Sequence, residues 1–161
     1  MKIDEARRSF FVEDEGAQDG FARKSWRGAV LDRDKYEWHA MPKLLWEALR
    51  EASEDSCWWI CGYAGSEMPQ PDPVSFSFDW DSFLYIPGWS VQGAVEWVAY
   101  NGSQTIAVLA EHDVTIVGAT QTVADELDRV LQDSGTNLRQ LTLADFPEPG
   151  RLEDFIKSVT K

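Results

Sequence analysis

The chain has 161 residues, of which 28 are acidic and 15 basic, so its formal net charge at pH 7 is −13. Contact with phosphate groups needs Lys and Arg, so this charge disfavours nucleic acids and anionic membrane surfaces as partners and favours a basic protein. An apolar fraction of 43% and an aromatic fraction of 12% exclude a disordered chain and predict a single globular domain over residues 1–161, with an irregular segment at residues 1–37.

The clearest helical periodicity predicts a helix over residues 41–54. Pro42 suits its first turn, and three apolar residues recur at helical spacing: Leu45, Leu49 and Ala52. Before this helix, residues 10–12 favour a short strand and VEDEGAQDG, residues 12–20, an exposed loop. After it, the short and continuously apolar run CWWICGY, residues 57–63, predicts a buried strand.

Strict alternation predicts another strand over residues 74–81. Large apolar residues alternate there with serine and aspartate, which places Asp79 and Asp81 on the solvent side of the strand. A proline-rich loop, residues 65–73, precedes this strand. A Pro-Gly turn follows it and is expected to expose Trp89.

Residues 94–118 predict a meander of three strands, because Val, Ile and Thr are enriched there. The dipeptide Asn101-Gly102 is typical of a tight type I′ hairpin, and residues 111–113 form the second turn.

The pattern becomes helical again over residues 122–133, with Thr122 as the N-cap. A short strand near residues 138–143 and a small helix over residues 152–159 complete the chain. This order of elements predicts an α+β fold with a mainly antiparallel sheet, a central meander and helices packed on one face. The second face is expected to stay partly open to solvent and to carry many of the acids.

The charge is distributed unevenly along the chain. Between Arg50 and Arg129 there is no Lys or Arg, and residues 51–128 hold thirteen Asp or Glu residues and five of the eight tryptophans. Residues 1–50 carry ten basic and ten acidic groups, and residues 129–161 carry five of each. The whole negative charge therefore lies in the middle of the chain, where it creates a field that selects partners.

The two cysteines predict neither a disulfide nor a metal site. On one strand, the Cα atoms of Cys57 and Cys61 would be about 13 Å apart, whereas a disulfide needs less than about 7 Å. Two thiols do not complete a zinc site, so buried packing is expected and no cofactor is predicted. The N-terminus shows no signal-peptide pattern and no apolar run approaches about 20 residues, which predicts a cytoplasmic protein that does not span a membrane.

Two alternatives to protein binding follow from the acids. Asp79 and Asp81, about 7 Å apart on one strand, could hold Mg²⁺ or act as acid and base together with His112, as in a small metal-dependent hydrolase. Carboxylates also imitate phosphates, so a nucleic-acid mimic that inhibits a DNA-binding protein is a further alternative. The sequence contains no nucleophile elbow and no phosphate-binding loop.

The acidic and aromatic middle of the chain, with DPVSFSFDWD and GAVEWVAYNG, resembles in class the bacterial immunity proteins. These are small, acidic α+β proteins that occlude the active site of a cognate antibacterial toxin. The resemblance lies in size, charge and composition. It implies a protein that is not an enzyme and that neutralises a basic partner.

We expect the partner-binding surface to combine carboxylates with an aromatic anchor, because carboxylates pair with Lys and Arg and tryptophan is enriched at binding hot spots. The predicted binding residues are Asp79, Asp81, Trp89, Glu96, Glu111 and Asp113.

Overall fold

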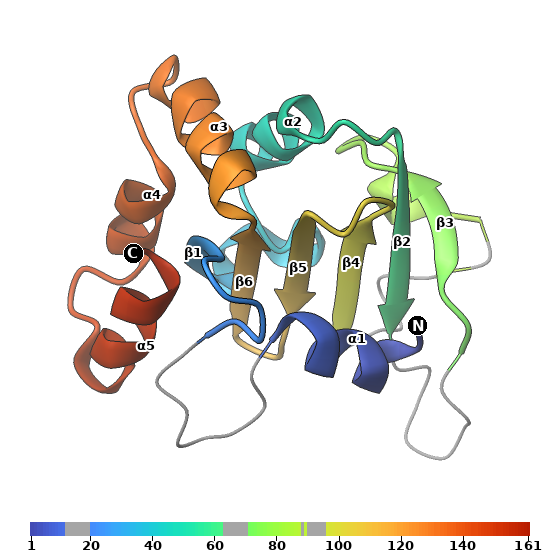
Figure 1. Ribbon diagram of the computed structural model, residues 1–161, viewed down its shortest axis with the longest axis horizontal. Helices are drawn as coiled ribbons and strands as arrows, with labels where there is room; N and C mark the ends of the chain where they lie inside the picture. Colours follow the sequence, from blue (N-terminus) through green and yellow to red (C-terminus); the bar gives the residue numbers. More distant parts are fainter. Residues whose placement is uncertain (12–19, 63–70, 88, 90–95) are drawn as a thin grey trace.

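Figure 1 shows a computed structural model of the protein, which describes residues 1–11, 20–62, 71–87, 89 and 96–161. Within these residues the strands form one six-stranded sheet in the order β1-β6-β5-β4-β2-β3, and every neighbouring pair is antiparallel. The strands are β1 (Arg27–Asp32), β2 (Cys57–Gly62), β3 (Val74–Ser77), β4 (Trp97–Asn101), β5 (Ile106–Ala110) and β6 (Val114–Ala119). The predicted α+β fold with a central antiparallel meander is confirmed.

Helices lie on both faces of the sheet and beside its β1 edge. Figure 1 shows α2 and α3 above the strands, α1 near their lower ends, and α4 and α5 beside β1. The α-helices are α1 (Ile3–Phe10), α2 (Lys43–Ala52), α3 (Gln121–Gln132), α4 (Leu138–Asp145) and α5 (Glu153–Val159). Among the described residues, short 3-10 helices are η1 (Arg33–His39), η2 (Phe83–Tyr85) and η4 (Gly150–Leu152). The helices predicted over residues 41–54, 122–133 and 152–159 correspond to α2, α3 and α5.

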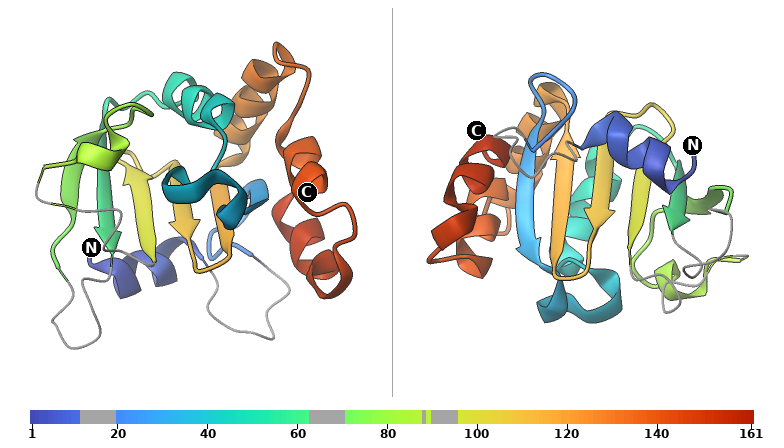
Figure 2. Two further views of the ribbon diagram at one scale, coloured as in Figure 1. Left: turned by 180° about the vertical axis from the view of Figure 1, so that it is seen from behind. Right: turned by 90° about the horizontal axis from the view of Figure 1, so that it is seen from below.

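The sheet has a hydrophobic core on each face. One core joins the sheet to α2 and α3 and includes Trp46, Trp58 and Trp97; the other joins it to α1 and α5 and includes Phe10 and Val159. The right view of Figure 2 shows α1 and η1 on opposite sides of the strands. The second face, expected to stay partly open and acid-rich, is covered by the core that α1 and α5 share with the sheet, and it stays open at β2 and β3, where Trp59, Ser75 and Ser77 are exposed. Strands β4 and β5 are buried along their whole length, which explains their continuous apolar sequence.

The N-terminal region contains two elements that the sequence did not predict, α1 and β1. In α1 the buried residues Ile3, Ala6 and Phe10 recur at helical spacing, with acids in the first turn and arginines in the last, as the helix dipole favours. The strand predicted at residues 10–12 is wrong, because Phe10 ends α1 and Phe11 makes only an isolated bridge with Phe21. Residues 12–19, which make up most of the predicted loop at residues 12–20, lie outside the described residues.

Strand β3 is shorter than the alternation predicts. It ends at Ser77, and the chain then turns between Asp79 and Ser82, where Asp79 Oδ2 accepts a hydrogen bond from the Ser82 N–H at 3.1 Å. This local bond between side chain and backbone competes with the strand ladder. The alternation is nevertheless correct in the part that forms β3, where Ser75 is exposed and Phe76 is buried.

The β4–β5 hairpin closes through a loop of residues 102–105 and not through a tight turn at Asn101-Gly102. Asn101 is fully buried at the end of β4, and its Oδ1 accepts hydrogen bonds from the N–H groups of Thr105 (2.9 Å) and Ile106 (3.0 Å). Gln104 takes the positive φ of the loop, 57°. The Asn101 side chain thus organises a longer loop than the dipeptide alone would form.

Residues 138–143, predicted as a strand, belong to helix α4. Asn137 caps this helix, since its Oδ1 accepts a hydrogen bond from the Gln140 N–H at 2.8 Å. The helix lies along the outer edge of β1, where Thr142 Oγ1 accepts from the Val30 N–H (3.0 Å) and Asp145 Oδ2 accepts from the Asp32 N–H (3.1 Å). Side chains therefore close the β1 edge of the sheet.

Helix α3 begins at Gln121, because its N-cap is Thr120 and not Thr122, as the sequence predicted. No helix in the described ranges is long and apolar enough to cross a membrane.

Candidate protein-binding surface

Two of the predicted binding carboxylates form ion pairs inside the fold. Arg7 of α1 donates from its two terminal nitrogens to Glu96 Oε2 and to Glu111 Oε1, both at 2.7 Å. The buried Arg33 donates to the backbone oxygen of Glu111. Burial raises the pKa of Glu111, and the Arg7 guanidinium only partly opposes this effect. These groups join α1 to β4 and to the β5–β6 turn, so their contacts are structural.

The remaining turn residues and Trp89 are placed differently. Asp113 and His112 are exposed in the β5–β6 turn. Trp89 is half-buried and not the exposed anchor that the turn predicts: its ring lies 6.2 Å from that of Phe83 and 6.5 Å from that of Trp97. It packs against the core formed with α2 and α3.

The turn that follows β3 carries the other two predicted carboxylates. Asp79 is half-buried and receives a long hydrogen bond of 3.5 Å from Arg50, besides the bond from Ser82. Asp81 is exposed, and no ion pair involving it occurs among the described residues. The exposed carboxylate of Asp81 can therefore meet a partner.

Beside this turn, His39 stacks on Trp80. The two ring centroids are 3.5 Å apart and the planes differ by 13°. His39 Nε2 lies 3.0 Å from the Trp80 carbonyl oxygen, and because that oxygen can only accept, Nε2 carries the proton. Burial lowers the pKa of His39, while the Trp80 carbonyl and the carboxylates of Asp81 and Glu37 favour its protonated form. Both carboxylates therefore lie within electrostatic range of the stack.

The backbone next to the stack is strained. Glu37 has φ 54° and ψ −134°, and Ala40 has φ 64°, in the region that favours glycine. Such conformations cost about 1–3 kcal/mol each and persist only where surrounding contacts hold them. Here Trp46 Nε1 donates to the His39 oxygen at 3.0 Å and Thr115 Oγ1 donates to the Ala40 oxygen at 2.7 Å.

Large aromatic side chains are exposed in the strained segment and beside it. Trp38 is 46% exposed. Helix η2 lies against η1, and its Tyr85 is 80% exposed. The left view of Figure 2 looks onto the side of the sheet that carries η1 and η2. We call the residues gathered here the acidic–aromatic surface: Glu37, Trp38, His39, Asp79, Trp80, Asp81 and Tyr85.

The sequence identified only part of this surface. Asp79 and Asp81 were predicted, but Glu37, Trp38, His39 and Tyr85 were not, because a ring stack and a positive φ depend on contacts between distant segments. The adjacent Trp38-His39 pair was the one local signal.

The residues proposed for a hydrolase do not converge. His112 follows β5, whereas Asp79 and Asp81 follow β3, and the two strands are three positions apart in the sheet, about 14 Å at about 4.8 Å per strand. Strands β5 and β3 are antiparallel to each other, so their carboxyl-terminal ends lie at opposite ends of the sheet. Within the described part of the chain, no group of three or more His, Cys, Asp or Glu side chains is arranged to hold a metal ion.

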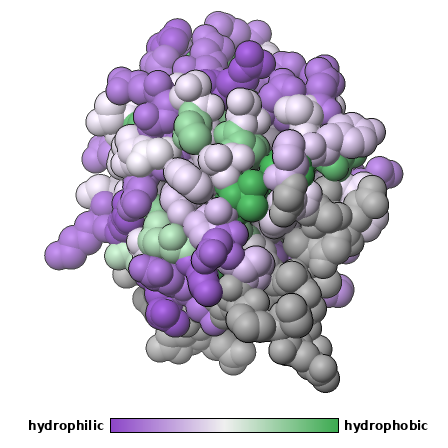
Figure 3. Space-filling model, turned by 90° about the vertical axis from the view of Figure 1, so that its right-hand side faces the viewer, coloured by the Kyte–Doolittle hydropathy of each residue, from purple (hydrophilic) through white to green (hydrophobic). Residues whose placement is uncertain are grey.

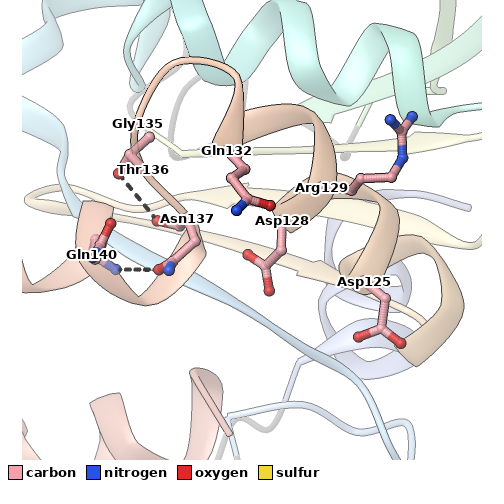
Figure 4. A pocket seen from close by; sticks show the side chains of 8 residues that line it. All are labelled: Asp125, Asp128, Arg129, Gln132, Gly135, Thr136, Asn137 and Gln140. Carbon is pink, nitrogen blue, oxygen red and sulfur yellow. Dashed lines mark hydrogen bonds between the residues drawn. The ribbon is translucent and has the colours of Figure 1, made fainter.

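A hollow of about 580 Å³ lies between α3 and the start of α4, shown in Figure 4. Several of its polar groups have partners in the fold. Asp128 Oδ1 accepts from the Leu138 N–H (2.9 Å), Asp128 Oδ2 accepts from Arg27 (2.7 Å), and Asn137 caps α4. These hydrogen bonds join α3 to β1 and to the start of α4.

No protein-family model matches the chain, and comparison with curated proteins and with solved structures finds no match. Functional inference therefore depends on the acidic–aromatic surface itself.

Proposed function

We propose that this protein binds a basic protein partner through the acidic–aromatic surface and thereby neutralises it, in the manner of a cytoplasmic immunity protein that occludes a cognate toxin. The observation that carries the proposal is the position of Asp81 and Glu37 beside the His39–Trp80 stack. Both side chains are exposed, and neither forms an ion pair among the described residues.

The physical chemistry of such a surface suits a cationic partner. Carboxylates steer a basic protein and pair with its Lys and Arg groups. Exposed Trp and Tyr side chains offer large contact area and cation–π attraction, and Trp38 and Tyr85 supply both. A toxin that acts on nucleic acid has a basic active-site surface, which an acidic protein can occlude.

A nucleic-acid mimic has less support. It requires many available carboxylates along one elongated face, whereas Glu96 and Glu111 already pair with Arg7 inside the fold.

Charge reversal tests the proposal. The double variant Glu37→Lys/Asp81→Lys should weaken binding of the natural partner by at least about ten-fold, because two attractive contacts become repulsive, equivalent to about 1.4 kcal/mol. The partner is first isolated from the producing cells by affinity capture and identified. Its Kd is then measured by calorimetry at low and high salt, since an electrostatic interface weakens with ionic strength.

The matched control is Asp133→Lys/Glu148→Lys, which makes the same change in net charge at two exposed positions outside the acidic–aromatic surface. The control should bind nearly as the natural sequence does. Equal weakening in both variants would show that only overall charge matters, and an unchanged Kd in the first variant would remove this surface from the interface.

A further inference from the structure

The two edges of the sheet differ. The N–H groups of Val30 and Asp32 at the β1 edge are held by Thr142 and Asp145 of α4. At the opposite edge, β3 pairs with β2 alone among the described strands. In general, an edge strand is a template for another strand.

Small side chains leave the β3 edge accessible on one face. Ser75 and Ser77 are exposed, and Ser75 lies in register with Trp59 of β2, which is 37% exposed. Figure 3 looks onto the side of the molecule where β3 lies, and apolar residues lie across its middle with hydrophilic residues above them. A strand beside β3 would thus meet backbone groups and a wide aromatic ring.

Carboxylates lie at both ends of β3. Asp72 precedes the strand with a side chain that is 90% exposed, 3.9 Å from Lys2 Nζ. Asp79 follows the strand, and Asp81 lies beyond it in the same turn. A basic segment along β3 would therefore meet negative charge at each end.

We propose that β3 accepts an extended, basic segment of the protein partner as an additional strand of the sheet. This inference rests on the proposed function and specifies how the partner binds: backbone hydrogen bonds to β3 supply affinity, and cationic side chains near Asp72 and Asp79 supply selectivity.

A second copy of the chain suits this edge less well. An antiparallel two-fold pairing of β3 with β3 brings Asp72 of each copy towards Asp79 of the other, and like charges placed opposite each other are destabilising. A basic strand reverses this repulsion into attraction at both ends.

Trp59 adds a specific contact for the added strand. That strand would lie about 10 Å from β2, two strand spacings away. Because Ser75 is small, a long Lys or Arg side chain can extend over it and place its charge on the Trp59 ring. A larger residue at position 75 would cover the ring.

The test uses two peptides of equal length and charge, one of repeated lysine-valine-threonine triplets and one of repeated lysine-valine-proline triplets. Proline at every third position removes N–H donors from both edges of the peptide. The threonine peptide should bind at least about ten-fold more tightly than the proline peptide, because only the threonine peptide can form a complete ladder of backbone hydrogen bonds with β3. It should also slow hydrogen exchange of the β3 amides.

Two variants test whether the peptide binds at β3. Ser75→Lys and Ser77→Lys should each weaken the threonine peptide, whereas Gln132→Lys, which adds the same charge on the exposed side of α3, should not. Urea unfolding of all three variants separates weakened binding from lost stability. Trp59→Leu should weaken binding of the lysine-containing threonine peptide more than binding of a peptide in which neutral residues replace the lysines. This difference would support the ring contact.

The outcomes separate this inference from the proposed function. Equal binding of both peptides, with no protection of β3, overturns strand addition but leaves an acidic binding surface. Failure of the threonine peptide to bind also overturns it, while the partner measurements with Glu37→Lys/Asp81→Lys decide the proposed function independently. Dimerisation that Ser75→Lys abolishes would assign the edge to a second copy and overturn the inference as well.

Discussion

His39 is a titratable side chain held between an aromatic ring and two carboxylates. Its ring stacks on Trp80 and its Nε2 donates to the Trp80 oxygen, while burial lowers its pKa despite Asp81 and Glu37. In the unfolded chain the histidine pKa is about 6.5. Below that value the unfolded chain therefore binds a proton that the folded protein binds less readily.

The sign of the pH dependence follows from this difference. The free energy of unfolding should rise with pH up to about 6.5 and then level off, because the stabilisation from neutral His39 is present above the unfolded pKa and is lost as pH falls towards the folded pKa. Urea unfolding from about pH 5 to about pH 8 measures this slope. His39→Asn should flatten it, and His112→Asn, in an exposed turn, should leave it in place; the opposite pattern would contradict the role of burial at His39.

Arg7 pairs with two carboxylates that the sequence suggests are unpaired. Glu96 and Glu111 read as free carboxylates in a segment without Lys or Arg, yet Arg7 reaches both from α1. Removing one partner of such a half-buried set leaves a poorly solvated charge. Acids that are prominent in the sequence thus support the fold.

At the level of elements, α4 decides which edge of the sheet is open. The pattern LRQLTLAD is short enough to suit either structure, but of its residues only Thr142 prefers strands, whereas Leu, Arg, Gln and Ala prefer helices. The Asn137 cap and the burial of Leu138 and Thr142 also favour the helix. Residue preference, capping and tertiary contact therefore agree on the helix.

Replacement of Thr142 by Val tests the edge contact with little change in shape. The variant loses the hydroxyl that accepts from the Val30 N–H and leaves that buried donor unpaired, so the free energy of unfolding should fall by about 1–3 kcal/mol. Urea unfolding measures the change, and hydrogen exchange at Val30 should become faster. Thr136→Val, the same substitution at a half-exposed position, should have a smaller effect. Equal losses would indicate that the β1 edge does not depend on α4.

For the whole molecule, the net charge of −13 acts against the compact state through self-repulsion. Added salt screens this repulsion over a Debye length of about 10 Å at 0.1 M. We therefore expect the thermal midpoint to rise with NaCl concentration, measured by calorimetry. The Asp133→Lys/Glu148→Lys variant carries less negative charge and should show a smaller rise; an equal rise would assign the effect to a general action of the salt.

The sequence predicted the elements whose signal is local and long. The helix that became α2, the strand β2 and the meander of β4, β5 and β6 follow from periodicity and strand preference. It failed for α1, β1 and α4, where the pattern is short or polar, and for the end of β3, where the Asp79 side chain replaces the strand ladder. The same limit applies to the binding surface, of which only Asp79 and Asp81 were identified.

The sequence by itself determined the class of the fold and the sign of the charge, because both follow from composition and short-range periodicity. Tertiary structure alone decided which carboxylates remain available, since Arg7 pairs with Glu96 and Glu111 across the fold and leaves Asp81 beside the His39–Trp80 stack. It also decided that α4 closes one edge of the sheet while β3 forms the other. The physical reason is that pairing, stacking and edge closure join segments far apart in the chain, and a local pattern does not encode their distance.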